Sequence, residues 1–319
     1  MLLVTVSRSR SNVQTFIVFL LFLLSLQSEL VGATRNVVLI FGYVPNQTAA
    51  IIAAAFYFCF GTVLTLHIVR LKNWWGLALP IGTLGSGLGF ITRYILAEPA
   101  YQTSKTTMII EEVLTLCFPA GFLAFNYIVY GRLVLYCVGA GHSLIRPQWV
   151  STFFIMSDIS TFVIQGIGAA FVVQPEHHDL GEKIVEVGVV LQTISFGIFS
   201  AMLLLTYASV RRERSTNGTE TWWRAYQAVA FSSTFIVLRS IYRMISSIDG
   251  SSSVIATTEI YLYLLDVLPL MIAIGVYIPF WPGSYTTGED SILHISIPEQ
   301  HKLSSVDAGS RELLASNEA

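Results

Sequence analysis

Seven long apolar stretches, several with charged residues inside them, limit what this chain can fold into. The stretches cover residues 49–69, 74–96, 108–130, 149–173, 184–208, 225–248 and 259–281. A helix needs about 20 apolar residues to cross the roughly 30 Å of hydrocarbon in a bilayer. Backbone polar groups in lipid must be hydrogen-bonded within their own segment, so the stretches are predicted to be helices. The sequence therefore predicts an all-α, polytopic membrane protein with a seven-transmembrane-helix bundle.

The composition supports a membrane protein and argues against several other classes. The chain is 54% hydrophobic and only 12% charged, whereas a soluble domain has roughly 25% charged residues. The formal net charge of -2 leaves no basic footprint, so no nucleic-acid partner is expected. The three cysteines, Cys59, Cys117 and Cys137, lie in or beside apolar stretches. They are read as small packing residues rather than as a disulfide framework.

The two ends of the chain have their own patterns. Residues 1–33 resemble a signal peptide, with Arg8 and Arg10 before an apolar run at 13–26 and small residues around Ala33. An uncleaved signal anchor is the alternative. Residues 34–48 are then a short extracytoplasmic N-terminus, and residues 49–282 are the seven-helix membrane domain. Residues 283–319 are rich in serine and acidic residues without an apolar period, which predicts a disordered cytoplasmic tail.

The distribution of Lys and Arg gives the orientation. Short cytoplasmic loops carry an excess of these residues. With the start of the first span outside, eight fall on the cytoplasmic side: Arg70, Lys72, Arg132, Arg146, Arg211, Arg212, Arg214 and Arg224. Only Arg35, Lys105 and Lys183 fall on the other side. The expected orientation is N-terminus extracytoplasmic and C-terminus cytoplasmic. It makes Asn46, in Asn-Gln-Thr, a candidate glycosylation site, and it leaves the sequon at Asn217 unmodified.

Ionisable residues inside the spans are the candidate functional residues. A charge in the bilayer is costly and normally faces the bundle interior, with a partner. The candidates from the spans are Arg93, Asp158, Gln165, Arg239, Arg243, Glu259 and Asp266, with Glu111, Glu112 and Glu186 nearby. Apart from Asp158, they are predicted in the outer half of the bundle. Arg239 and Arg243 are four residues apart and share a helix face. The pattern indicates an outward-facing polar cavity; interhelical ion pairs that lock the bundle without a ligand are the alternative.

Glycine, proline and tryptophan mark packing and boundaries. Gly82, Gly85, Gly87 and Gly89 in the second span, and Gly166 and Gly168 in the fourth, predict close helix packing. A backbone that opens during a transport cycle is the other reading of these glycines. Pro119 and Pro269 are expected to kink their spans. Five tryptophans at the predicted cytoplasmic boundaries are expected to form an aromatic belt: Trp74, Trp75, Trp222, Trp223 and Trp281.

Six short motifs, in order along the spans, resemble those of a known family. They are Tyr-x-Pro at 43–45, Gly-Phe-Ile-Thr-Arg at 89–93, DISTFVIQGIG at 158–168, Gly-x-x-x-Gln at 188–192, Arg239 with Arg243, and Glu259 with Tyr263 and Asp266. Through them, residues 41–282 resemble the fungal RTA-like, or lipid-translocating exporter, family. The resemblance adds Gln192 to the candidate site. It also shows two departures, because Ser86 and Ser246 stand where the family usually has Glu.

The resemblance implies a function in moving lipids or amphiphiles. Family members are associated with export of lipids and sphingoid bases and with resistance to toxic amphiphiles, and one branch with porphyrin traffic. In a translocator, Arg93, Arg239 and Arg243 would hold a phosphate or carboxylate, while the acids would hold an amine or carry protons. The substrates would be membrane lipids or amphiphilic small molecules. A homo-oligomer or a regulatory protein partner is left open.

Two other functional classes, a receptor or regulator and a zinc hydrolase, are alternatives to a translocator. A seven-helix receptor or sensor, or a regulator of lipid asymmetry without transport, matches the helix count, but the chain lacks the Asn-Pro-x-x-Tyr motif of receptors. A zinc hydrolase needs converging histidines, whereas His67, His142 and His177 are predicted at different places. The sequence therefore predicts no metal site, no cofactor and no enzymatic activity. The plasma membrane is the expected location, with the vacuole or another endomembrane as the alternative.

Overall fold

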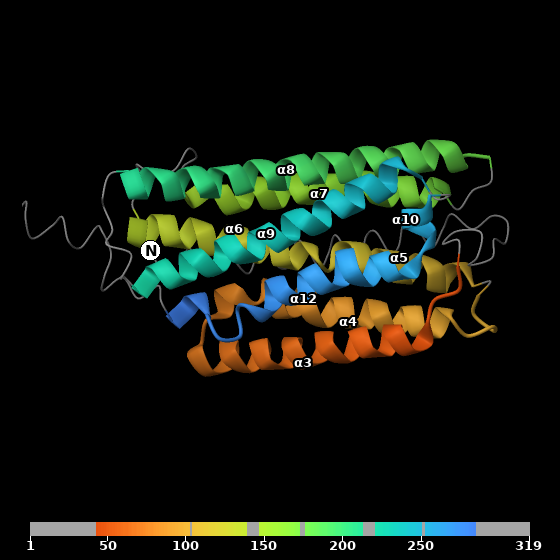
Figure 1. Cartoon of the computed structure of the whole chain (residues 1–319), viewed down its shortest axis with the longest axis horizontal. Coiled ribbons are helices and arrows are strands. Elements are labelled where there is room, and N and C mark those ends of the chain that lie inside the picture. Colours follow the sequence, from red (N-terminus) through yellow and green to blue (C-terminus); the bar gives the residue numbers. More distant parts are fainter. Residues whose placement is uncertain are drawn as a thin grey trace, which may run out of the picture.

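The computed structural model describes residues 43–102, 104–138, 147–172, 176–212, 221–250 and 253–284. In these ranges the chain is a bundle of helices along one long axis (Figure 1), without any strand. The helices are α3 (Gln47–Leu71), α4 (Ala78–Leu96), α5 (Lys105–Cys117), α6 (Ala120–Leu133), α7 (Pro147–Val172), α8 (His178–Arg212), α9 (Thr221–Ile248), α10 (Val254–Thr257), α11 (Glu259–Tyr261) and α12 (Leu268–Gly275).

Six helical segments among the described residues are long and apolar enough to cross a membrane. They are Gln47–Leu71, Trp74–Leu96, Thr106–Val138, Trp149–Ala169, His178–Arg212 and Trp222–Ile248. Large apolar side chains such as Phe56, Ile198 and Leu204 are more than half exposed on the outer surface of the bundle. Such a surface suits lipid, which is as apolar as these side chains. The prediction of an all-helical, multi-pass membrane protein is confirmed.

The last predicted span, 259–281, is not one continuous helix. It consists of α11, a π-helical segment (Leu262–Val267) and α12. Pro269 lies in the first turn of α12 and has no N–H to donate, so the regular hydrogen-bond ladder is interrupted there. The expected kink at Pro119 is also present, because α5 ends at Cys117 and α6 begins at Ala120. Whether this broken segment crosses the membrane as a seventh span stays a prediction, as does the orientation of the termini.

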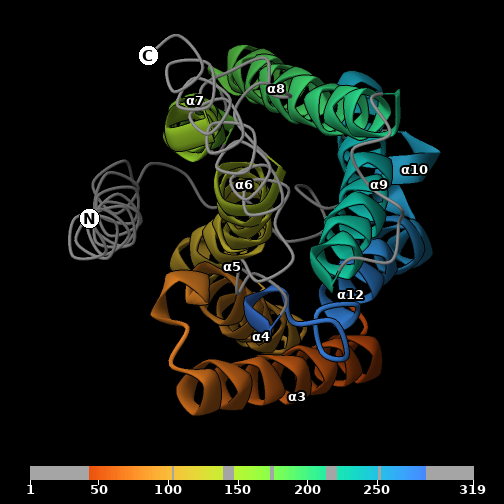
Figure 2. The same cartoon turned by 90° about the vertical axis from the view of Figure 1, so that its left-hand side faces the viewer.

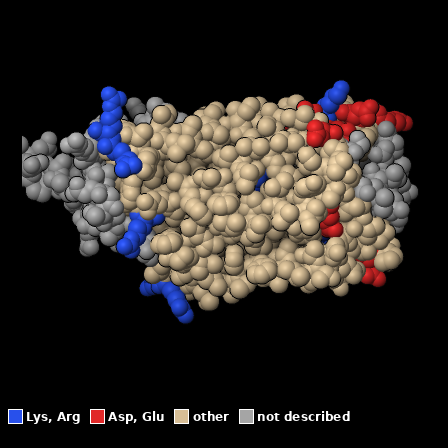
Figure 3. All heavy atoms as spheres, in the orientation of Figure 1, with Lys and Arg blue, Asp and Glu red and all other residues tan. Residues whose placement is uncertain are grey.

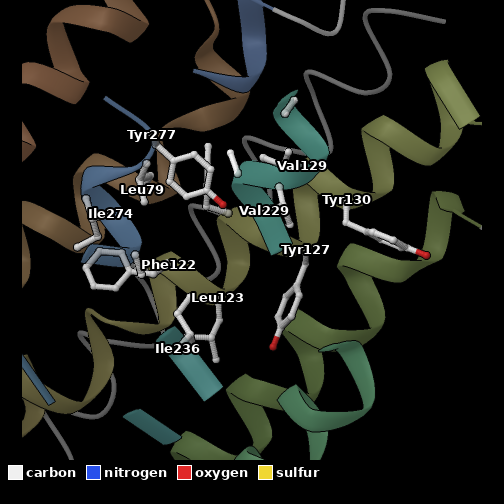
Figure 4. Packing of buried hydrophobic residues seen from close by; sticks show 14 of the residues in the cluster. Leu79, Phe122, Leu123, Tyr127, Val129, Tyr130, Val229, Ile236, Ile274 and Tyr277 are labelled. Carbon is white, nitrogen blue, oxygen red and sulfur yellow. The ribbon is translucent and has the colours of Figure 1, made fainter. Parts of the chain in front are cut away.

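The core is built around α6, which lies between α7 and α4 and also contacts α9 (Figure 2). Its side chains are buried along most of its length. Leu79, Phe122 and Ile274 gather beside Tyr277, and Tyr127 and Tyr130 project from the same helix α6 (Figure 4). The centre of the bundle is therefore filled by aromatic and aliphatic side chains, and polar groups within it need specific partners.

Glycines allow the closest helix contacts, as the sequence predicted. A Cβ atom at Gly82 would lie 2.7 Å from the carbonyl oxygen of Phe118, and one at Gly121 would lie 2.6 Å from that of Ala78. A Cβ at Gly168 would lie 2.7 Å from the backbone nitrogen of Val185. The backbones of α4 and α6, and of α7 and α8, therefore approach each other at positions that only glycine fits.

The expected tryptophan belt is only partly found. Trp74 is 54% exposed, as a belt residue should be. Trp222 and Trp281 are instead buried, and Trp75 stacks on Trp281 with ring centroids 6.3 Å apart. The belt prediction is wrong for Trp222, Trp223 and Trp281, because these three side chains are buried inside the bundle rather than facing the membrane interface.

Several predictions concern residues outside the described ranges. The signal segment at 1–33, the tail beyond residue 284 and the sequon at Asn217 are among them. The division of the chain at residues 33, 48 and 282 therefore stays a prediction.

Candidate functional site: a buried network of arginines and carboxylates

Arg93 joins four segments near the N-terminal end of α3. Its side chain is buried at the last turn of α4, and its Nη1 lies 2.9 Å from Glu111 Oε1 on α5. Its Nη2 donates to the Tyr43 hydroxyl at 2.6 Å, and its Nε lies 3.6 Å from Glu259 Oε1. Burial raises the pKa of Tyr43, so this hydroxyl stays protonated at neutral pH. A charge this deeply buried needs such partners.

Glu259 ties the start of α11 to the start of α3. Its carboxylate accepts the backbone N–H of Asn46 at 2.9 and 3.1 Å, and the Tyr263 hydroxyl donates to it at 3.3 Å. The Asn46 side chain itself accepts from the backbone N–H of Ala49 and caps α3. Asn46 is exposed, and its glycosylation stays a prediction.

Asp266 is the partner of both arginines of α9. The Arg243 fork reaches both carboxylate oxygens, with Nε 3.1 Å from Oδ1 and Nη2 3.2 Å from Oδ2. Arg239 Nε lies 2.7 Å from Oδ1, at an angle that makes an ion pair rather than a directed hydrogen bond. The four-residue spacing places both guanidinium groups on one face of α9, as predicted. Asp266 lies in the π-helical segment, a type of irregularity that is frequent at functional sites.

Glu112 connects the two groups of charges. It interacts electrostatically with Glu111, Arg93, Arg243 and Asp266. Three guanidinium groups therefore face four carboxylates, those of Glu111, Glu112, Glu259 and Asp266. We call these seven residues the arginine–carboxylate network. It forms without acids at positions 86 and 246: Ser86 is buried and donates to the carbonyl oxygen of Gly82, while Arg93 pairs with Glu111 instead.

Asp158, Gln165 and Gln192 lie apart from this network. The Tyr127 hydroxyl donates to Asp158 Oδ2 at 3.0 Å, and Gln165 Nε2 donates to Gln192 Oε1 at 3.0 Å. Asp158 Oδ1 and Gln165 Oε1 are buried without a hydrogen-bond partner. No ion pair within the described ranges joins Asp158 to an arginine. The structure thus divides the predicted site into an arginine–carboxylate network and a separate polar seam between α6, α7 and α8.

The sequence reasoning missed several residues of the interior. Tyr43 and Tyr263 complete the surroundings of Arg93 and Glu259. Asn126 was also missed: it accepts from the Tyr277 hydroxyl at 2.5 Å, and its amide donates to Ser232 and Ser233 at 3.3 Å. A carboxamide in the middle of an apolar span was a readable signal for Asn126. The two tyrosines stand in the Tyr-x-Pro motif and in the motif of Glu259 and Asp266, but those motifs alone did not mark them as site residues.

Charge is separated along the length of the molecule. Figure 3 shows most of the Lys and Arg atoms at one end of the bundle and Asp and Glu at the other, where some Lys or Arg atoms also lie. The basic end is where α3 and α8 finish and α9 begins, with Arg70, Lys72, Arg211, Arg212 and Arg224. The acidic end carries Glu98, Glu182 and Asp249. Figure 3 also shows a small area of Lys or Arg atoms in the middle of the otherwise uncharged side of the bundle, far from both ends. In the described ranges, no group of three or more His, Cys, Asp or Glu residues is placed to hold a metal ion.

Comparisons with known proteins show similarity to several fungal proteins. Protein RTM1 of Saccharomyces cerevisiae is 25% identical over 204 residues, which is 63% of this chain and 65% of the relative. Protoporphyrin uptake protein 1 of the same species is 28% identical over 206 residues, or 64% of this chain and 66% of the relative. A probable lipid transporter of Emericella nidulans, atnI, is 25% identical over 255 residues, or 73% of this chain and 65% of the relative.

The chain thus spans about two thirds of the length of these relatives. No solved structure matches it. The family described as "RTA1 like protein" matches residues 79–289, which include Arg93, both arginines of α9 and Asp266. This match covers most of the chain and agrees with the order of motifs along the spans, so the chain belongs to the RTA1-like family.

Proposed function

We propose that this protein translocates lipids or lipid-like amphiphiles in the membrane, and that it does so without enzymatic chemistry. Relatives named as a probable lipid transporter and as a protoporphyrin uptake protein support a role with amphiphilic cargo. A polar headgroup would bind in the arginine–carboxylate network while the apolar part of the molecule stays among lipid-facing helix surfaces. Resistance to toxic amphiphiles and a place in the plasma membrane, or in an endomembrane, belong to this proposal.

The observation that carries the proposal is the partial exposure of Arg243. Its side chain is 20% exposed although it forms a two-point ion pair with Asp266, whose side chain is 3% exposed. A planar guanidinium binds carboxylate and phosphate oxygens in the same forked geometry. A headgroup phosphate or carboxylate can therefore replace Asp266 on Arg243 without changing the geometry of the fork.

Asp158 is the residue best suited to carry a proton or to hold an amine. It is buried, and among the described residues its only side-chain partner is the Tyr127 hydroxyl, while its Oδ1 has no donor. Asp266 and Glu259, by contrast, are paired with arginines. A buried carboxylate without a cation is costly, so Asp158 is expected to take a proton or a cationic group. The sequence carries no nucleotide-binding motif, and any energy input would therefore come from a gradient or from a partner protein.

A second function, sensing or regulating lipid asymmetry without transport, has its own support. Each arginine of the network already has a carboxylate partner. Such pairs can lock a bundle in one state, and a ligand that competes for one arginine would shift the protein to another. The two functions differ in one measurable property, because only a translocator moves lipid in the absence of other proteins.

Reconstitution into liposomes tests the proposal. Fluorescent lipids with phosphate or amine headgroups would be followed across the bilayer, with and without a proton gradient. Wild-type protein is expected to move lipid faster than protein-free liposomes, and Arg243→Gln to slow this movement about tenfold or more, since charged hydrogen bonds contribute about 1.5–3 kcal/mol. Arg224→Gln removes an exposed charge at the basic end and serves as the matched control. Movement no faster than in empty liposomes under both conditions would leave the sensor as the surviving function.

A further inference from the structure

A second arginine site lies at the basic end, away from the arginine–carboxylate network. Arg132 is in the last turn of α6 and is half-buried, not in a loop as the sequence suggested. Its guanidinium carbon lies 4.7 Å from the centre of the Trp75 ring and 5.4 Å from that of Tyr136. Its Nε is buried without an acceptor. No carboxylate in the described part of the chain pairs with it, whereas the three arginines of the network all have one.

Two further buried nitrogen atoms without hydrogen-bond partners lie in the aromatic stack that continues from Trp75. Trp75 stacks on Trp281, and Trp281 stacks on His67 at 6.2 Å between ring centroids. Trp281 Nε1 and His67 Nδ1 are buried without partners. Asn73 Nδ2 and Trp281 Nε1 lie 2.0 and 2.7 Å from the point that a Cβ atom would occupy at Gly283. Both nitrogen atoms therefore pack tightly against Gly283, next to the aromatic stack.

The buried polar atoms that lack a hydrogen-bond partner are of different types in the two parts of the bundle. In the seam between α6, α7 and α8 they are acceptors, Asp158 Oδ1 and Gln165 Oε1. Around Trp75 they include a guanidinium N–H and an indole N–H. Buried donors that find no acceptor in the protein are normally satisfied by an ordered water or a bound ion. A group of donors with an uncompensated positive charge selects an anionic ligand that offers several oxygens.

From this arrangement we propose that Arg132, with Trp75 and Tyr136 as its walls, binds a phosphate group. Phosphate oxygens match the guanidinium fork. Aromatic walls and the exposed cation Lys72 at the same end suit a headgroup at a membrane surface. The ligand class is a phosphate-containing anion, either the headgroup of an anionic phospholipid or a soluble phosphate. The site is independent of the proposed translocation, because it shares no residue with the arginine–carboxylate network.

The test uses the full chain, purified and placed in nanodiscs of neutral phosphatidylcholine. Thermal unfolding would be recorded with increasing fractions of phosphatidic acid in the disc, or with inorganic phosphate added in solution. A ligand that binds only the folded state raises the unfolding temperature by mass action. Phosphatidic acid is expected to stabilise the wild-type protein, and the phosphate dependence then separates the two sources: stabilisation by inorganic phosphate alone assigns the site to a soluble phosphate.

Variants locate the site. Arg132→Gln is expected to weaken phosphatidic acid binding at least about tenfold, the loss of one charged hydrogen-bond pair. Arg132→Lys keeps the charge and loses the fork, so it should recover only part of the affinity. Arg70→Gln removes an exposed charge from the same end and should bind as wild type does. The proposal is overturned if wild-type protein is not stabilised by either phosphate source, or if Arg70→Gln and Arg132→Gln weaken binding equally. The measurements on wild-type protein with each phosphate source test the proposal even if Arg132→Gln does not fold.

Discussion

At the scale of single residues, the carboxylates of the network are not equivalent. Arg93 has two acidic neighbours, Glu111 at 2.9 Å and Glu259 at 3.6 Å. Arg239 has an ion pair with Asp266 alone. Removing one partner from a buried ion pair leaves an uncompensated charge in a medium of low polarity, and this costs more than the pair itself contributes. Replacing Asp266 should therefore lower the free energy of unfolding much more than replacing Glu259.

The variant Asp266→Asn is expected to lower the free energy of unfolding by about 3–5 kcal/mol, because two guanidinium groups lose their counter-charge. Glu259→Gln should lower the free energy of unfolding by less, because Arg93 still has Glu111 as a partner. Both would be measured by thermal or denaturant unfolding in detergent. Asp249→Asn is the matched control, because the same chemical change is made on an exposed residue at the end of α9. Equal effects of the Asp266 and Asp249 changes would show that the network adds nothing to stability.

The sequence predicted some of these pairings and could not predict others. The spacing of Arg239 and Arg243 was sufficient to place them on one face of a helix, and charge alone made Asp266 a plausible partner. The choice of Glu111 for Arg93 depends on how α4 and α5 are rotated and tilted against each other, which periodicity does not fix. Tyr43 enters the site from outside the membrane segments, so no pattern within a span could have indicated it.

At the scale of helices, glycine decides how closely α4 packs on α6. Gly82 and Gly121 face each other, and an added Cβ at either would meet backbone atoms of the opposite helix. Backbone atoms cannot rotate away as a flexible side chain can. The run of glycines in the second span predicted this packing correctly. The break of the last span into α11, a π-helical segment and α12 was not predicted in this form, because Pro269 indicates an irregularity but not its register.

Gly82→Ala is expected to destabilise the bundle by about 1–3 kcal/mol, the usual cost of overpacking a well-packed interior. The measurement is the unfolding temperature in detergent. Gly197→Ala is the control, because Gly197 also lies inside a helix but an added Cβ there meets nothing within 4 Å. Alanine favours helix more than glycine does, so Gly197→Ala should be neutral or slightly stabilising. A stable Gly82→Ala protein would mean that α4 and α6 can separate without loss, as expected of a backbone that opens during transport.

At the scale of the whole molecule, charge separation gives the bundle a direction. The basic end and the acidic end lie at opposite ends of the long axis (Figure 3). Cytoplasmic loops are the ones enriched in Lys and Arg, so the basic end is expected to face the cytoplasm. Glu259 binds the backbone at the start of α3, which places the arginine–carboxylate network towards the acidic end. The proposed phosphate site at Arg132 would then lie at the inner surface, where anionic phospholipids are concentrated.

Single cysteines test this orientation in intact cells. Cys59, Cys117 and Cys137 are free thiols and would first be replaced by alanine. Ala100→Cys, between α4 and α5, and Lys72→Cys, just after α3, then place one exposed thiol at each end. A membrane-impermeant maleimide is expected to label Ala100→Cys in intact cells and Lys72→Cys only after permeabilisation. The reverse pattern would place the network on the cytoplasmic side. A headgroup bound there would then come from the inner leaflet.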